Sequence, residues 1–449
     1  MITDVSDNKK GVYKMKKNRM FLLLSLMSLL VVSGALLAGC GGSNKSSSGK
    51  TEIRFSWWGG DSRHTATLNA IKLFEKENPD IKVKAEYSGF DGIVEKMTTQ
   101  IAGGTAPDLM QINYDWLVNY SPDGTGFYDL STLKGLDLSG FSDDLLETGK
   151  VDGKLNAVPV SINAATLMFN KTEFEKNGIE IPKTWDELFA AAKKFPDGNY
   201  PLYESPYTGF LLATKYIQQK YGVQFITKDG ELGFSKDQIN EALSFYNKLV
   251  EDKVLPPVEE SVGEMSGAST VNESPAFLEG KYAGVDDWST QAPVYELALK
   301  NADNQELEFL GMPTMDNMKD TGLSVKPAML FAVSKNTKHP EETAKLLNFI
   351  LNDEEAVKEL KLERGVPANS KAAKILEEDG TTTGIAKIAN DYVTENMSPM
   401  PLSPYFEASK VSESWSPVMD SFAYGETSLK DATTQIYDGV TKALKEIKE

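Results

Sequence analysis

Strand-like and helix-like segments alternate early in the chain, and this order restricts the fold more than any other feature. Residues 52–57 and 81–87 alternate apolar and polar side chains, and residues 109–112 form a short apolar run, as strands do. Between these strands, apolar side chains recur at helical spacing in residues 68–74 and 93–101. Such an alternation predicts right-handed crossovers and a parallel, doubly wound sheet of the α/β class.

Later helices are marked by residues at their N-terminal ends. Thr184 with Glu187 and Ser235 with Gln238 have the spacing of capping boxes, and Pro340 occupies a favoured first helical position. A helix-rich α/β chain of about 400 residues exceeds the length at which a single core stops growing, about 250–300 residues. We therefore expect two α/β lobes.

The composition excludes several classes of protein. Acidic residues outnumber basic ones by 65 to 47, which gives a net charge of −18 and argues against nucleic acid, whose phosphates need a basic surface. The single cysteine cannot form an intrachain disulfide, and two histidines leave little material for an imidazole metal site. We expect no metal ion, no cofactor and no nucleic acid.

A basic stretch and an apolar run occupy the N-terminus. Positions 9–19 hold six Lys or Arg residues, and residues 20–39 carry no charge. An export signal has this arrangement, as does an uncleaved membrane anchor. Leu37-Ala38-Gly39-Cys40 resembles the lipobox of bacterial lipoproteins, which implies lipidation of Cys40 and anchoring on the outer face of the cell membrane. We expect residues 1–39 to be a signal peptide and residues 40–50 a lipidated, Gly/Ser-rich tether.

Aromatic side chains and Asp, Asn or Arg follow each of the three predicted strands. Ligands of open parallel sheets bind outside the carboxyl ends of the strands. Aromatic faces stack on the C–H faces of a sugar ring, and Asp, Asn and Arg hydrogen-bond its hydroxyls, so the mixture predicts a sugar site. The candidate residues are Trp57, Trp58, Asp61, Arg63, Asp91, Asn113, Asp115 and Trp116.

Several of these residues also have structural interpretations. Trp57 and Trp58 point to opposite faces of a strand, so we expect one of them in the core. Asp91 and Asp115 could each cap the helix or turn that follows. The prediction of a sugar site therefore depends on the clustering at three strand ends.

Motifs along the chain carry a family resemblance. They include the opening WWGG, LFEKENPDIKVKAEY, QIAGGTAPDLMQIN, FLEGKYAGVDDW and FAVSKNTKHPEETAKLLNFIL. In their order and spacing the chain resembles family 1 extracellular solute-binding proteins, the sugar-binding subunits of ABC importers. WWGGDSRH, TTQIAGGTAPD and ERGVPAN are most similar to members that capture pectic oligosaccharides such as oligogalacturonides.

The resemblance implies a two-lobed periplasmic-binding-protein fold. Each lobe would be a mainly parallel sheet flanked by helices, with the ligand cleft between the lobes. The first lobe would comprise residues 51–161 and 309–330, and the second residues 162–308 and 331–449. A monomer of this kind would close on an oligosaccharide by a hinge motion and deliver it to permease subunits, with no catalysis.

Comparison with maltose-binding proteins implies which residues contact the ligand. On the first lobe these are Trp57, Trp58, Asp61, Asp115 and Trp116; Asn163 matches a polar contact at a crossover; Tyr207, Trp288 and Trp415 match aromatic platforms of the second lobe.

Cations near the cleft could read the carboxylate of a uronic acid. An arginine fork binds a carboxylate with two hydrogen bonds, and Arg63 and Arg364 both lie in motif segments flanking the predicted cleft. Lys326 is a third candidate cation. Each arginine could instead pair with a carboxylate of the protein, and Glu363 adjoins Arg364.

Two other functions remain open. A lipid-anchored glycoside hydrolase could use Asp286 and Asp287 as acid and base, although neighbours on one strand point to opposite faces. The chain could also bind a solute other than a sugar.

Overall fold

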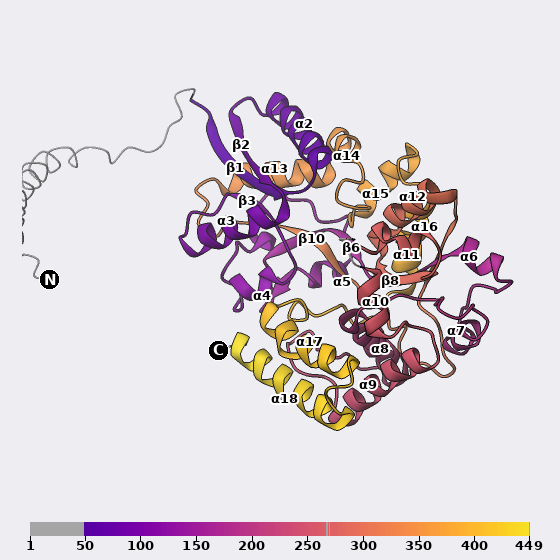
Figure 1. The fold of residues 1–449 in the computed structure, drawn as a ribbon. Helices are drawn as coiled ribbons and strands as arrows, with labels where there is room; N and C mark the ends of the chain where they lie inside the picture. Colours follow the sequence, from indigo (N-terminus) through magenta and orange to yellow (C-terminus); the bar gives the residue numbers. More distant parts are fainter. Residues whose placement is uncertain (1–48, 266–267, 269, 449) are drawn as a thin grey trace, which may run out of the picture. The chain divides into compact units, whose positions relative to one another are not determined.

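The computed structural model describes residues 49–265, 268 and 270–448 (Figure 1). The predicted signal peptide and Cys40 lie outside the described residues, as does the side chain of Asp91. Along the described part of the chain, no helix combines the length and the hydropathy that a membrane crossing requires. Residues 51–449 form one compact unit, which holds both sheets described below.

The first sheet contains five strands in the order β2-β1-β3-β10-β6. β1 pairs in parallel with β2 and with β3, which confirms the predicted parallel arrangement of these strands. β10 runs antiparallel between β3 and β6, so the complete sheet is mixed. The strands are β1 (Thr51–Trp58), β2 (Ile81–Ser88), β3 (Leu109–Ile112), β6 (Ala157–Asn163) and β10 (Lys326–Val333).

Helices cover both faces of the first sheet. Phe55 and Phe331 lie on a face buried by α2 (Asp61–Glu77), α13 (Pro340–Asn352) and α14 (Glu354–Leu360). Met110 lies on the opposite face, against α3 (Phe90–Ala102) and α4 (Trp116–Tyr120). This sheet and its helices are called the first lobe below.

The second sheet has three strands in the order β8-β7-β9, and both pairs are antiparallel. Its strands are β7 (Ala165–Asn170), β8 (Gly284–Trp288) and β9 (Leu307–Gly311). The α/β class is confirmed, but the prediction of a mainly parallel sheet in each lobe is wrong here. The chain passes from β6 to β7 through Ala164 alone, and β7 runs antiparallel to both of its neighbours. β8 and β9, which α12 (Ala292–Asp303) connects, are parallel to each other, but β7 lies between them, so no hydrogen-bonded pair in this sheet is parallel.

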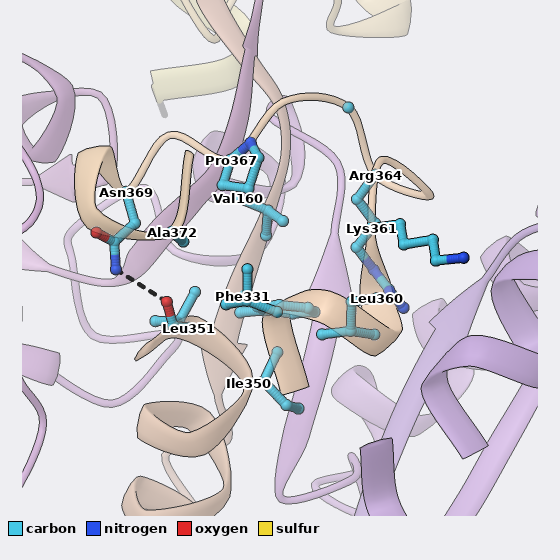
Figure 2. A pocket seen from close by; sticks show the side chains of 12 residues that line it. Val160, Phe331, Ile350, Leu351, Leu360, Lys361, Arg364, Pro367, Asn369 and Ala372 are labelled. Atoms are coloured by element: carbon cyan, nitrogen blue, oxygen red, sulfur yellow. Dashed lines mark hydrogen bonds between the residues drawn. The ribbon is translucent and has the colours of Figure 1, made fainter. Parts of the chain in front are cut away.

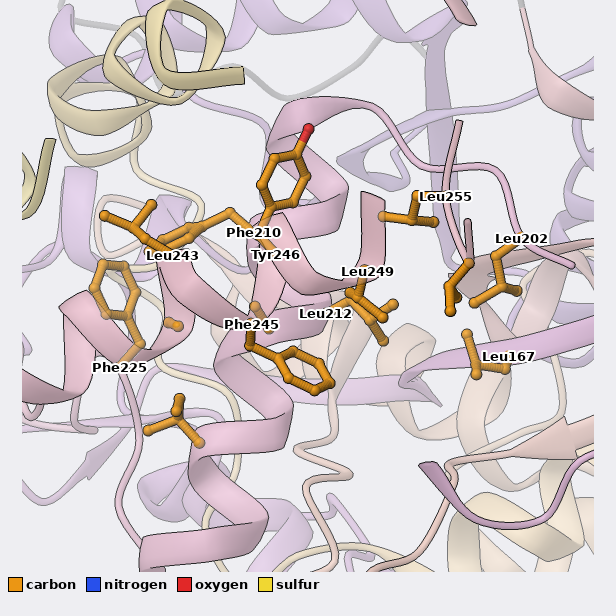
Figure 3. Close-up of a cluster of buried hydrophobic side chains, with 14 of the residues drawn as sticks. Leu167, Leu202, Phe210, Leu212, Phe225, Leu243, Phe245, Tyr246, Leu249 and Leu255 are labelled. Atoms are coloured by element: carbon orange, nitrogen blue, oxygen red, sulfur yellow. The ribbon is translucent and has the colours of Figure 1, made fainter. Parts of the chain in front are cut away.

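A helical core surrounds the second sheet, and together they are called the second lobe. α8 (Pro206–Tyr221), α9 (Lys236–Glu251), α17 (Ser409–Ala423) and α18 (Leu429–Lys448) enclose one large apolar cluster, part of which Figure 3 shows. α9 begins at the capping box of Ser235 and Gln238, as predicted. α7 (Trp185–Ala192) likewise begins at the box of Thr184 and Glu187.

The predicted lobe boundaries after residue 308 are wrong. β9 hydrogen-bonds to β7, which puts residues 307–311 in the second lobe. β10 completes the first sheet, and α13 and α14 bury its face, so residues 326–360 belong to the first lobe. The chain returns to the second lobe at α16 (Gly384–Asn396), which contributes Ile385 and Ala389 to the cluster around β9.

Short elements complete the fold. They are β4 (Lys150–Val151), β5 (Lys154–Leu155), α5 (Asp143–Glu147), α6 (Lys171–Lys176), α10 (Val258–Glu264), α11 (Pro275–Leu278), α12 (Ala292–Asp303) and α15 (Ser370–Glu378), with single 3₁₀ turns at Leu130–Thr132, Val271–Glu273 and Ser289–Gln291.

Candidate functional site

The second lobe contains a cavity of about 280 Å³ beside the end of β8. α8, the end of β8 and the segment between α16 and α17 form its walls. A cavity of this size and mixed lining suits a small polar ligand. Its aromatic and charged lining includes Tyr207, Lys215, Asp286, Asp287, Trp288 and Glu407.

Two predicted platform residues, Tyr207 and Trp288, share this cavity. The Tyr207 ring stacks on Trp415, with 4.6 Å between the ring centroids and 15° between the planes. Trp415 itself has no exposed surface, so its prediction as a ligand platform is wrong: it supports Tyr207 from the core. The ammonium of Lys326 lies 4.3 Å from the centroid of the Trp288 ring, a cation–π distance.

The acidic pair of β8 is fully engaged in protein contacts. Asp286 accepts hydrogen bonds from Lys215 Nζ at 2.6 and 2.7 Å. Asp287 accepts from the Tyr295 hydroxyl at 2.8 Å and from a backbone N–H. Behind them, Glu204 is buried, and burial together with the Asp286 carboxylate raises the pKa of Glu204. These carboxylates form a hydrogen-bonded network in which Asp286 and Asp287 have different partners.

Glu407 joins the cavity to the first lobe. Its Oε1 forms an ion pair with Lys326, the first residue of β10. Burial and the charge of Glu407 raise the pKa of Asp115, in the first lobe, to about 6. Asp115 also accepts hydrogen bonds from Asn113 at 2.7 Å and Asn119 at 2.9 Å. The Asp115 side chain makes no capping hydrogen bond to α4, so the alternative interpretation of Asp115 as a cap is wrong.

The predicted tryptophans of the first lobe are buried. Trp57 has no exposed surface and donates a hydrogen bond from Nε1 to His64, so its prediction as a ligand contact is wrong. The ring centroids of Trp58 and Trp116 lie 5.9 Å apart on the opposite face of the sheet. The Phe90 ring packs edge-on against Trp58, with 5.4 Å between their centroids. Trp57 and Trp58 do point to opposite faces, as predicted, but both faces are covered by helices.

The two arginines support the backbone of the first lobe. Arg63 donates to the carbonyls of Glu363 and Trp58. Arg364 is 6% exposed and donates to Gln111 Oε1 at 2.9 Å and to Thr67 at 3.0 Å. The prediction that Arg364 reads a ligand is therefore wrong.

In the described part of the chain, the hydrogen-bond partners of the Arg364 guanidinium are neutral oxygens. Burial, and then the charge of Arg63, lowers the pKa of Arg364 to about 9, although Glu363 opposes the shift. Figure 2 shows Arg364 at the edge of an apolar pocket of about 40 Å³ that also contains Val160 and Phe331. This pocket lies inside the first lobe and is too small for a sugar ring.

The remaining candidates lie in different places. Asp61 is the exposed first residue of α2. Asn163 ends β6 and accepts hydrogen bonds from Ser289 Oγ at 3.0 Å and the Thr290 amide at 3.2 Å, so it ties the crossover to the second lobe.

Sequence reasoning missed Lys215 and Glu407 as cavity residues. Lys215 and Gln218 recur at helical spacing beside apolar positions of α8, a pattern that could have indicated a polar stripe facing inward. Glu407 follows an irregular Pro-containing segment about 290 residues after Asp115, and no local pattern connects the two.

Comparison with known proteins adds to this geometry. Residues 69–386 match the family described as bacterial extracellular solute-binding protein. A periplasmic solute-binding protein from Pectobacterium atrosepticum is 37% identical, with a TM-score of 0.82 over 89% of this chain and 100% of that one. A periplasmic oligogalacturonide-binding protein from Yersinia enterocolitica, in complex with saturated digalacturonic acid, is 36% identical, with a TM-score of 0.77 over the same shares. The maltodextrin-binding protein of Bacillus subtilis is 25% identical over 92% of this chain and 94% of its own length.

Proposed function

Because the chain belongs to the bacterial extracellular solute-binding proteins, we propose that it captures an oligosaccharide outside the cell and delivers it to the permease of an ABC importer. Relatives and structural neighbours named for maltodextrin and for oligogalacturonide support a sugar ligand. The observation that carries the proposal is the cavity of about 280 Å³, where Tyr207 and Trp288 accompany charged and amide side chains. Aromatic faces beside hydrogen-bonding groups are the combination that a sugar ring requires.

Capture proceeds by hinge closure in this proposal. Asn163 and Lys326 lie where the chain passes between the lobes, so a small rotation there moves Asp115 relative to the cavity. The ligand stabilises the closed arrangement by contacting both lobes, and the permease accepts that arrangement. We expect the protein to act as a monomer with no cofactor.

Lipid anchoring at Cys40 is part of the proposal. A lipidated cysteine would hold the domain at the membrane through the Gly/Ser-rich tether of residues 41–50. In cells fed a labelled fatty acid, the wild type should incorporate label and partition with membranes, whereas Cys40→Ala should lose both properties. Label retained in Cys40→Ala would refute anchoring at this residue.

The comparisons also bear on whether the sugar is charged. The neighbour bound to digalacturonic acid favours a ligand that contains uronic acid. Arg63 is still a candidate for a carboxylate contact. Its Nε and Nη1 donate to backbone carbonyls, which, within the described residues, leaves Nη2 for a ligand.

A thermal-shift screen of the chain from residue 41 onward tests the function. A ligand that binds only the folded state stabilises it by about 2.7 kcal/mol at a hundredfold excess over Kd. At least one neutral oligosaccharide or oligogalacturonide should therefore raise the melting temperature, while amino acids and dipeptides should not. Product analysis of the same mixtures separates binding from hydrolysis: cleavage of the sugar would refute a binding protein.

A further inference from the structure

The ion pair between Lys326 and Glu407 leaves one carboxylate oxygen unused at the cavity wall. Glu407 Oε1 contacts Lys326, whereas its Oε2 is buried and has no hydrogen-bond partner among the described residues. A buried carboxylate oxygen without a donor is costly, because the charge has lost its water. Glu407 lines the cavity, and a donor in the cavity would reach this buried oxygen once the lobes move apart and the contact with Lys326 opens.

The other carboxylates of the cavity are already hydrogen-bonded. Asp286 accepts from Lys215, and Asp287 accepts from Tyr295. Within the described lining, Glu407 Oε2 is the buried side-chain oxygen that still needs a donor.

The charges around Glu407 determine which donor fits. The carboxylates of Asp286, Asp287 and Glu407 outnumber the ammonium groups of Lys215 and Lys326. Asp115 adds a further carboxylate from the first lobe, close enough for Glu407 to raise its pKa. A ligand carboxylate placed here would meet like charges in a partly buried setting, where repulsion is weakly screened.

We propose that Glu407 is a ligand-binding residue whose Oε2 accepts a hydrogen bond from a hydroxyl of an uncharged sugar unit, and that the second-lobe cavity discriminates against a uronate unit. This inference rests on the proposed function and specifies the substrate class of the same cavity. Arg63 does not line this cavity, so its charge does not offset that repulsion here.

A matched pair of ligands tests the charge preference directly. Digalacturonic acid and its dimethyl ester share rings and linkage and differ in charge and in two small methyl groups, and galactobiose serves as a second uncharged disaccharide that lacks these methyl groups. Titration calorimetry should show the ester or galactobiose binding at least tenfold more tightly than the free acid. This measurement uses the wild-type chain from residue 41, so it does not depend on how any variant folds.

Glu407→Gln tests the assigned residue. The Gln amide oxygen still accepts a hydrogen bond, but the acceptor is no longer charged, so affinity for the uncharged ligands should fall about tenfold. Affinity for digalacturonic acid should rise, since Lys326 loses its counter-charge. Glu413→Gln, an exposed position on α17, makes the same change in net charge and should leave both affinities unchanged.

The outcomes separate the two proposals. Tighter binding of the free acid than of both uncharged ligands would overturn the inference and leave the proposed function intact. Equal losses in Glu407→Gln and Glu413→Gln would remove Glu407 from the site. If no oligosaccharide binds the wild type, the proposed function fails and the inference fails with it.

Discussion

At the residue scale, stacking between aromatic rings decides which candidate side chains reach the cavity. Tyr207 and Trp288 were predicted as platforms and line one cavity, whereas Trp57 and Trp415 have the same chemistry but no exposed surface. The difference lies in neighbours that are distant in sequence: Tyr207 covers Trp415. A pattern of residue types cannot say which side of an aromatic pair faces outward.

Asp115 should make the stability of the folded protein depend on pH. Its pKa is about 6 in the folded protein, because of burial and Glu407, against 3.8 as the ordinary value. Between these values the folded state holds more protons than the unfolded state, so stability falls as pH rises and the full penalty is present above pH 6. Urea unfolding at pH 4 and pH 7.5 should show that Asp115→Asn gains stability over the wild type at the higher pH only.

A control and a contrary result complete this experiment. Asp143→Asn, an exposed position in α5, makes the same change in charge. An equal difference between Asp115→Asn and wild type at both pH values would show that Asp115 does not titrate in this range.

At the element scale, local signals predicted elements more accurately than their partners. The capping boxes at Thr184 and Ser235 begin α7 and α9, because a cap is a contact between residues three apart. β10 was divided between two lobes in the prediction, yet it pairs entirely within the first sheet. Its apolar run fits either sheet, and only the register with β3 and β6 determines its place.

Gly311, the last residue of β9, packs closely against Tyr392 of α16. It adopts φ +88°, and a β-carbon there would lie 2.0 Å from ring atoms of Tyr392, whose hydroxyl accepts a hydrogen bond from the Met312 amide. Gly311→Ala combines backbone strain with overpacking and should destabilise the fold by about 2–5 kcal/mol in urea unfolding.

Gly178→Ala provides the control for this substitution. Gly178 also has a positive φ, +65°, but no atom lies within 4 Å of the position that an added methyl group would occupy. Backbone strain alone predicts a loss of about 1–2 kcal/mol. Equal losses at the two glycines would show that Tyr392 yields to the added methyl group.

At the scale of the whole molecule, a two-lobed α/β protein could be predicted, but not the direction of every strand. The parallel strands β1, β2 and β3 of the first sheet follow from the strand and helix periods near the N-terminus. The antiparallel second sheet does not, because about 115 residues separate β7 from β8 and no local pattern sets their relative direction.

Ligand binding should make the molecule more compact. Hinge closure brings the lobes together, so X-ray scattering should show a smaller radius of gyration when a stabilising oligosaccharide is added. A sugar that gives no thermal shift serves as the control. An unchanged radius at saturating ligand would rule out closure as the means of capture.

The place of β10 in the first sheet also affects how the chain is made. Val333 pairs with Leu109, more than 200 positions earlier, and β10 lies between β3 and β6. A ribosome that has completed β6 has therefore produced a sheet with an open edge at β3, and that edge stays unpaired for more than half of the remaining synthesis. Contacts of such long separation form slowly. The first lobe thus stays incompletely folded during most of translation, until the ribosome has made β10.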